Sequence, residues 1–393
     1  MDRKQIQQIL HQYPTPLYVF DIPVLLERIA YLKKMLPEHV SLCYAVKANT
    51  FILSYIKDVI GRFEVCSPGE LRICQMQGLP PEKLVISGVY KTPELMEELI
   101  GDGFDAGIYT VESVEQFGLL KKLADRYGQN IRLLLRLTSG SQFGVEADQI
   151  REMIRTAQTD PFVEIRGIQY FSGTQKTSIK RLAKELAKAD HFLQSLKEEF
   201  KTELPELEFG PGFPVAYFKG EDFNEEEFLT EFSDLLNGLS HKGHITLELG
   251  RSIAASCGTY MTRVVDTKTN KGQNYAIMDG GIHQMVYYGQ SMAMKQPLCQ
   301  LFPDGTGKGE NLWNLCGSLC TMNDILVKQL PADHVKIGDV VLFKNTGAYA
   351  MTEGIALFLS RDLPRILIRE NDRVLCVRDG YQTYPLNLPG KGL

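Results

Sequence analysis

The sequence predicts an α/β protein that joins a (β/α)8 TIM barrel to a second, mainly antiparallel β domain. Up to Leu249, eight short apolar runs alternate with amphipathic helical stretches, a pattern typical of parallel strands with helical crossovers. After Gly250 the helical periodicity fades, and short strands follow one another across turn sequences. The 393 residues also exceed the about 50 to 250 residues of an ordinary domain. We therefore predict a barrel domain at 24–262 and a β domain formed by 1–23 and 263–393.

The predicted barrel elements agree with the fold in number and length. The strands are SLCYAV (41–46), FEVC (63–66), KLVISG (83–88), DAGIYT (105–110), IRLLLRL (131–137), IRGIQYF (165–171), ELEFG (206–210) and HITLEL (244–249). Helical stretches between or before them include 23–36, 67–78, 92–103, 113–128 and 178–200. In such a barrel the active site lies at the carboxyl ends of the strands, so the residues after each run are the candidates for function.

The β domain is predicted from five short strands separated by turn sequences such as NKG and ENDR. They are GTYMTRVVDT (258–267), NYAIMDGG (274–281), DVVLFKN (339–345), RILIREN (365–371) and DRVLCVRDG (372–380). The run LYVFD (17–21) precedes the first barrel strand by a whole helix, and we expect it to join the β domain.

Charge and composition exclude several classes of protein. A net charge of −5 gives no basic surface for nucleic acid. The polar N-terminal residues lack a signal-peptide core, and no stretch approaches the roughly 20 apolar residues that cross a bilayer. The eight cysteines include no C-x-x-C pair, which argues against a zinc site or a disulfide framework. We expect a cytoplasmic protein with no metal site and with neither nucleic acid nor membrane as a partner.

The end of the first predicted strand carries the most informative residue, Lys47, in Tyr44-Ala45-Val46-Lys47. A lysine held among apolar neighbours has a lowered pKa and can form a Schiff base with an aldehyde. On position alone, a solvated loop lysine is an equally good interpretation.

The other strand ends add groups that together suit one kind of cofactor. Glycines at strands six and seven favour phosphate binding, because such turns present backbone N–H groups. A phosphorylated aldehyde needs an amine for the aldehyde, amides for the phosphate and an anion for the pyridine nitrogen. The candidates are Arg136, Phe171-Ser172-Gly173-Thr174, Gly210-Pro211-Gly212 and Glu248-Leu249-Gly250-Arg251. The sequence therefore predicts pyridoxal 5′-phosphate at the barrel rim.

The motifs YAVKAN, SPGEL, SGTQ, GPG, ELGR, DGG, GSLCTMND and GAY follow in one order from Thr15 to about Tyr349. In order and spacing they resemble the ornithine/diaminopimelate/arginine decarboxylases of the alanine-racemase-like fold. The resemblance implies that Lys47 binds the cofactor's aldehyde and that Glu248 faces its pyridine nitrogen. It also implies that Cys320, from a second subunit of a homodimer, protonates the product carbon.

The resemblance implies further contacts around the cofactor and the substrate. The cofactor-binding residues would be Lys47, Arg136, Phe171, Thr174, Gly210, Gly212, Glu248, Gly250, Arg251 and Tyr349. The predicted substrate contacts are Arg251, His283, Thr321 and Tyr349. His283 would be a contact particular to this chain, and a purely structural histidine is an equally good interpretation.

The chain departs from the family pattern at four positions. Phe171 stands where a ring-stacking histidine is usual, and Pro211 interrupts a triple glycine. Thr321 replaces the acid that holds the distal amine of diaminopimelate, and 282–289 contains no arginine for the distal carboxylate. Losing such charged partners costs roughly 2–5 kcal/mol. Two substrates therefore stay open: free diaminopimelate, and a modified or carrier-protein-tethered amino acid.

Two other functions compete with decarboxylation. An amino-acid racemase would share the barrel, the cofactor and the lysine, but it needs a second base on the opposite face of the substrate, and the Cys320 loop argues against it. A non-catalytic cofactor-binding regulator is the alternative from another class, and the retention of Lys47, Glu248 and Cys320 argues against that.

Overall fold

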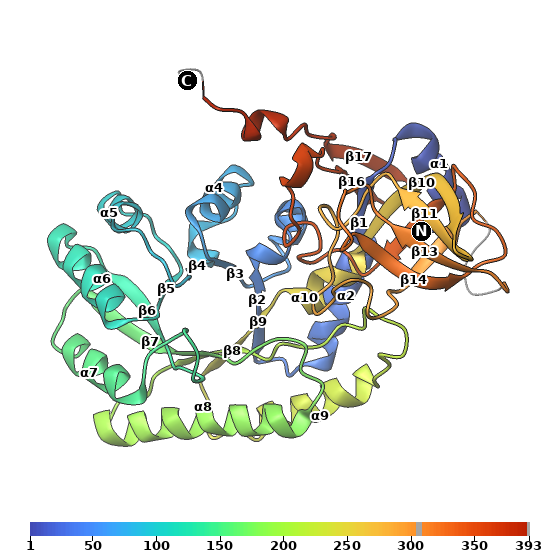
Figure 1. The fold of residues 1–393 in the computed structure, drawn as a ribbon. Coiled ribbons are helices and arrows are strands. Elements are labelled where there is room, and N and C mark those ends of the chain that lie inside the picture. Colours follow the sequence, from blue (N-terminus) through green and yellow to red (C-terminus); the bar gives the residue numbers. More distant parts are fainter. Residues whose placement is uncertain (304–308, 391–393) are drawn as a thin grey trace. The chain divides into compact units, whose positions relative to one another are not determined.

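The computed structural model describes residues 1–303 and 309–390, and these form two compact units (Figure 1). The barrel unit contains 29–214 and 223–253, and the β unit contains 1–28, 215–222 and the described residues from Ala254 onward. Helix α2 (Ile22–Met35) begins in the β unit and ends in the barrel unit. No helix among the described residues is both long and apolar enough to span a bilayer.

Eight parallel strands close the barrel in sequence order, which confirms the predicted fold class. They are β2 (Val40–Ala45), β3 (Arg62–Val65), β4 (Leu84–Ile86), β5 (Ile108–Val111), β6 (Ile131–Arg136), β7 (Val163–Phe171), β8 (Glu206–Gly210) and β9 (His244–Leu249). The ring closes because β9 pairs in parallel with β2, with Glu248 opposite Cys43. Cys43, Val85, Ile108 and Leu134, from four of these strands, pack together in one buried cluster.

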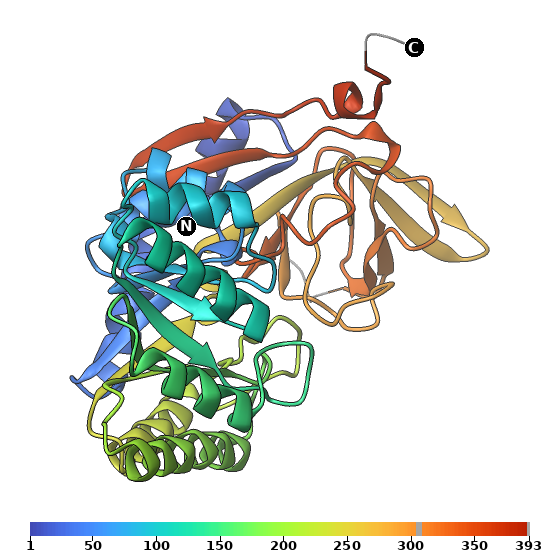
Figure 2. The same ribbon diagram turned by 90° about the vertical axis from the view of Figure 1, so that its left-hand side faces the viewer.

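Helices cover the outside of the barrel, as Figures 1 and 2 show. They are α3 (Leu53–Ile56), α4 (Pro68–Met76), α5 (Pro93–Gly101), α6 (Val114–Tyr127), α7 (Ala147–Ala157), α8 (Ile179–Phe200), α9 (Glu225–Asn237) and α10 (Arg251–Ala254). Side-chain caps set several of their starts: Ser67, Ser113 and Ser178 accept hydrogen bonds from the backbone N–H three residues on. These caps lie between a strand end and a helix, so they also fix where the rim loops stop.

The β unit is built on a nine-stranded, mainly antiparallel sheet. Its elements are α1 (Arg3–Gln12), β1 (Leu17–Asp21), β10 (Gly258–Asn270), β11 (Gln273–Met278), β12 (Cys299–Phe302), β13 (Leu312–Cys316), β14 (Ile325–Pro331), β15 (Val340–Lys344), β16 (Arg365–Glu370) and β17 (Arg373–Arg378). The long gold β10–β11 hairpin is plain in Figure 2. Strand β1 lies between β10 and β16, which confirms that LYVFD joins this domain.

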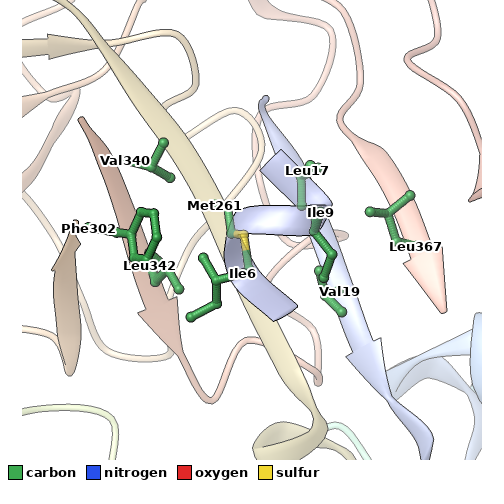
Figure 3. Close-up of a cluster of buried hydrophobic side chains, with 9 residues drawn as sticks. All are labelled: Ile6, Ile9, Leu17, Val19, Met261, Phe302, Val340, Leu342 and Leu367. Carbon is green, nitrogen blue, oxygen red and sulfur yellow. The ribbon is translucent and has the colours of Figure 1, made fainter. Parts of the chain in front are cut away.

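The hydrophobic core of the β unit lies between helix α1 and this sheet. Figure 3 shows the side chains that form it, from α1, β1, β10, β12, β15 and β16: Ile6, Ile9, Leu17, Val19, Met261, Phe302, Val340, Leu342 and Leu367. All nine are buried. The sequence analysis did not predict β12, β13 and β14, although β13 and β14 flank the Cys320 loop.

Candidate active site

Lys47 lies in a short 3-10 turn (Val46–Ala48) directly after barrel strand β2. Its Nζ lies 2.5 Å from Glu64 Oε2 and 3.7 Å from Glu248 Oε1. It also lies 3.5 Å from Cys66 Sγ, and 40% of the side chain is exposed. The amine therefore faces two carboxylates, which differs from the apolar surroundings that the sequence suggested.

The two carboxyl groups beside Lys47 have pKa values that are shifted in opposite directions. Burial acts to raise the pKa of Glu64, but the Lys47 charge and hydrogen bonds to the carboxylate outweigh it and hold the pKa at about 2. Burial and then the negative charge of Glu64 raise the pKa of Glu248 well above its ordinary value. Glu64 is thus the anionic partner of Lys47, and the surroundings of Glu248 favour its protonated form.

A third carboxyl group, Glu208 on β8, lies fully inside the barrel beside the first two. The amide of Gln169 connects it to Glu248, because Gln169 Nε2 donates to Glu208 Oε1 at 2.7 Å and to Glu248 Oε2 at 3.4 Å. Burial raises the pKa of Glu208 to about 7, and the negative charge of Glu64 adds to the effect. The barrel interior thus holds three buried carboxyl groups, and Lys47 contacts two of them, Glu64 and Glu248.

The raised pKa of Glu208 makes the protein less stable as the pH rises. The unfolded chain releases this proton near pH 4.3, whereas the folded chain keeps it until about pH 7, so stability falls across that interval. We expect Glu208→Gln to stabilise the fold by roughly 2–4 kcal/mol at pH 8 and to have little effect at pH 4. Urea unfolding at the two pH values measures the difference.

Glu206 on the same strand gives a matched control with the opposite sign. Arg62 and Arg166 pair with its carboxylate at 2.6 and 3.0 Å. Burial opposes them, but these partners lower the pKa of Glu206. Glu206→Gln should therefore destabilise the protein at pH 8. An equal response of the two variants to pH would contradict the assignment of Glu208.

The loops after β7 and β8 meet in a tight glycine cradle. Gly212 has a φ of +63°, and a Cβ there would lie 2.1 Å from the carbonyl oxygen of Gly173. A Cβ on Gly210 would lie 2.4 Å from the Phe171 ring. Lys176 N–H donates to the Gly212 carbonyl at 3.0 Å. Because only glycine fits at these positions, the backbone can approach a ligand closely, as a phosphate site requires.

Arg136, at the end of β6, forms its own buried pair within the barrel unit. Its Nη1 lies 2.9 Å from Glu112 Oε2, and its guanidinium lies 4.7 Å from the centre of the Phe143 ring. Lys91 lies close to this pair and is itself buried, and burial lowers its pKa to about 8 although Glu112 opposes the shift. Arg136 is thus held rigidly by groups that the sequence did not predict.

The remaining barrel candidates follow the strand ends as predicted. Gly250 directly follows β9, and Arg251 begins α10 and is buried. Thr174 lies in the cradle, where its Cα would be 2.9 Å from a Cβ on Gly212. Within the barrel unit the structure therefore brings together Lys47 and Glu248, and separately the glycines and Thr174.

The β unit holds the other four candidates: His283, Cys320, Thr321 and Tyr349. Cys320 is exposed, and all eight cysteines are free thiols. His283 is 1% exposed; burial and the charge of Arg361 lower its pKa to about 4, so its imidazole is neutral at pH 7. Tyr349 has a φ of +64°, an uncommon conformation for a non-glycine residue.

The Cys320 loop is organised around a buried carboxylate, Asp324. Its oxygens accept the backbone N–H groups of Ile282 and Leu319, each at 2.8 Å. A Cβ on Gly281 or Gly317 would lie within 2.5 Å of this carboxylate. Asp324 therefore explains why Gly281 and Gly317 are glycines. It also connects the Cys320 loop to the segment that follows Asp279-Gly280-Gly281.

Sequence reasoning missed Glu64, Glu208, Gln169, Glu112 and Asp324. Each is a polar residue within or next to an apolar run. In a barrel, alternate residues of a strand face the interior, so a carboxylate in phase with core residues was the available signal. The sequence could not show that Glu64 pairs with Lys47, because Lys47 follows strand β2 and Glu64 lies on β3.

The donor set in the barrel unit fits pyridoxal 5′-phosphate. Lys47 would supply an amine for the aldehyde, Glu248 a buried carboxyl for the pyridine nitrogen, and the Gly212 cradle a close backbone approach for the phosphate. Lys47 and Gly212 follow strands β2 and β8, and Glu248 lies on β9 of the same closed barrel.

Comparisons with known proteins agree with this chemistry. Residues 24–255 match the family model for the pyridoxal-dependent decarboxylase, pyridoxal binding domain. The chain is 26% identical to a diaminopimelate decarboxylase of Campylobacter jejuni, over 90% of this chain and 89% of that protein. It is 24% identical to the L-glutamyl-[BtrI acyl-carrier protein] decarboxylase of Niallia circulans, over 96% of this chain and 94% of that protein.

A solved structure supports the fold at low identity. A diaminopimelate decarboxylase from Helicobacter pylori, complexed with L-lysine, superposes with a TM-score of 0.85 at 22% identity, covering 97% of this chain and 98% of that chain. The family model matches more than half of the sequence, and the site agrees with it. The chain therefore belongs to the pyridoxal-dependent decarboxylases.

Proposed function

We propose that this enzyme decarboxylates an α-amino acid whose distal end is neutral, because it is joined to a carrier protein or to another building block. The observation that carries the proposal is that two β-unit segments lack the charged residues that would hold a charged distal end of the substrate. Thr321 follows that cysteine, 282–289 contains no arginine, and His283 is neutral at pH 7 because its pKa is about 4.

A cavity of about 190 Å³ in the β unit supports a neutral substrate arm. It lies beside the Cys320 loop, and the described residues that line it, among them Ile282, Val286, Met292 and Ile325, are uncharged. An uncharged and largely apolar cavity of this kind favours an aliphatic chain over an ammonium or carboxylate group. The similarity to a decarboxylase named for an acyl-carrier-protein conjugate agrees with this.

In the proposed mechanism, the barrel residues bind the cofactor and control protons. When bound, pyridoxal 5′-phosphate supplies an electron sink for the electrons of the broken bond to the carboxylate. Lys47 would hold the aldehyde end through its amine. Glu248 would hold the pyridine nitrogen in its protonated form, and Gly212 with Thr174 would hold the phosphate. Arg136, Phe171, Gly210, Gly250, Arg251 and Tyr349 are the further proposed cofactor contacts.

Cys320 is the proposed proton donor to the product carbon, and it would act in the site of a second copy of the chain. Its loop is rigid at the base through Asp324, yet Cys320 itself is exposed, as a residue that serves a partner's site must be. We therefore propose a homodimer with shared active sites, located in the cytoplasm. The proposed substrate contacts are Arg251, His283, Thr321 and Tyr349.

Free diaminopimelate is the second candidate substrate. Arg361 in the β unit favours it, because Arg361 Nη2 donates to the Ser318 carbonyl at 2.9 Å, two residues before Cys320. A guanidinium at that place could bind a distal carboxylate. The 26% identity to a diaminopimelate decarboxylase agrees with this choice.

A panel of substrates tests the proposal. We expect carbon dioxide release from glutamyl conjugates to exceed release from diaminopimelate, lysine, ornithine and arginine by about 30- to 5000-fold in kcat/KM, since roughly 2–5 kcal/mol separates a matched from an unmatched charged end. Cys320→Ala should lower kcat about 10²- to 10⁴-fold, as expected for a general acid. Efficient turnover of diaminopimelate by the native enzyme, lost in Arg361→Ala, would instead establish the second candidate. Loss of optical activity without carbon dioxide release would indicate a racemase.

A further inference from the structure

The loop between β7 and α8 is held by an ion-pair network in which Lys176 is buried, Glu185 is mostly buried and Arg181 is exposed. Lys176 belongs to this loop, and its side chain is 1% exposed. Its Nζ lies 2.6 Å from Glu185 Oε2, one and a half turns into α8. A lysine so completely covered cannot contact substrate or bulk solvent, so its role must be to hold what surrounds it.

The same carboxylate binds a second cation that reaches the other end of the loop. Arg181 Nε lies 3.0 Å from Glu185 Oε1, and Arg181 Nη2 donates to the Ser172 carbonyl at 3.2 Å. Glu185 therefore connects both ends of the segment 172–176 to helix α8. We name Lys176, Arg181 and Glu185 the α8 brace.

The α8 brace connects directly to the cradle. Lys176 N–H donates to the Gly212 carbonyl at 3.0 Å, and the Lys176 ammonium lies 5.8 Å from the centre of the Phe171 ring. Gly173, opposite Gly212, has a φ of +129°, a conformation that few residues other than glycine adopt. The brace thus holds both ends of a loop whose conformation depends on glycine.

We propose that Lys176, Arg181 and Glu185 are positioning residues that preorganise the loops after β7 and β8 for the phosphate group of the cofactor. The energetic reason is preorganisation: a glycine-rich loop that is already ordered loses little conformational freedom when the anion binds. The brace does not touch the anion, so it acts only through the backbone that it fixes. This inference rests on the proposed placement of the phosphate at the Gly212 cradle.

The test compares two ligands that differ only in the phosphate. Pyridoxal 5′-phosphate and pyridoxal are titrated into cofactor-free enzyme, and the dissociation constant of each is measured. Lys176→Met should raise the constant for pyridoxal 5′-phosphate about 10- to 100-fold, the range expected when a charge-assisted contact is lost. The constant for pyridoxal should change less than about threefold. A general loss of structure would raise both constants together, and that result would overturn the proposal, as would no change in either.

Two further variants keep the test decisive. A buried carboxylate left without its partner can unfold a protein, so the double variant Lys176→Met with Glu185→Met removes both charges together and should give the same selective loss. Lys197, on the same helix, pairs at 3.0 Å with Glu203 in the segment that follows it, but both side chains are about half exposed. Lys197→Met is therefore the matched control and should leave both constants unchanged.

Gly212→Ala separates failure of the brace from failure of the phosphate placement. Its Cβ would enter the cradle itself, so it should selectively weaken binding of pyridoxal 5′-phosphate whether or not the brace matters. If Gly212→Ala is selective and Lys176→Met is not, the brace proposal is wrong and the placement stands. If neither is selective, the placement is wrong as well.

Discussion

Replacing Lys47 by alanine is expected to abolish decarboxylation, with a fall in kcat on the order of 10⁴-fold. That is the upper end of the contribution of one acid–base side chain, and the covalent bond to the cofactor is lost as well. Borohydride reduction of the native holoenzyme should attach the cofactor permanently to the peptide that contains Lys47. The variant should yield no such peptide in mass spectrometry.

A charge-preserving variant distinguishes the covalent role of Lys47 from its electrostatic one. Lys47 lies 2.5 Å from Glu64, so its removal leaves a buried carboxylate without a cation, and the pKa of Glu64 should rise from about 2. Lys47→Arg keeps a cation beside Glu64 but supplies no amine for an aldehyde. We expect Lys47→Arg to be more stable than Lys47→Ala and equally inactive. Activity in Lys47→Arg would mean that another amine carries the cofactor.

Replacing Glu248 by glutamine is expected to lower kcat by about 10²- to 10³-fold while the cofactor stays bound. Removal of one preorganised electrostatic group from a buried site has effects of this size. Glutamine has the shape of glutamate, but it carries no charge and cannot stabilise a protonated pyridine nitrogen. Carbon dioxide release, measured at saturating substrate and at known cofactor content, gives kcat directly.

The effect of Glu248 should depend on charge and not on packing. Glu248→Asp retains the carboxylate on a shorter side chain and should recover part of the lost kcat. Gln169 Nε2 donates to Glu248 Oε2 at 3.4 Å, and neither variant changes this neighbouring amide. An unchanged kcat in Glu248→Gln would exclude this carboxyl group as the partner of the pyridine nitrogen.

Much of the fold could be predicted because its signals are local. Each barrel strand is an apolar run bounded by a helical stretch, and the predicted helices at 23–36, 67–78, 92–103, 113–128 and 178–200 match α2, α4, α5, α6 and α8. Strand β12 was missed because the polar Gln300 interrupts its short apolar run. Strands β13 and β14 were missed because their burial alternates weakly and both carry register shifts.

The sequence by itself determined which groups stand at the rim of the barrel. Parallel strands that close a barrel bring their carboxyl ends to one face, so Lys47, Gly212 and Glu248 had to meet there once eight strands were recognised. Only the tertiary structure decided which residues form ion pairs with one another and which residues hold the rim loops in place. Glu64 rather than Glu248 is the close partner of Lys47, and Glu185 is the partner of Lys176. The physical reason is that ion pairing and pKa depend on burial and on distances of a few ångströms between side chains, which the order of residues along the chain does not contain.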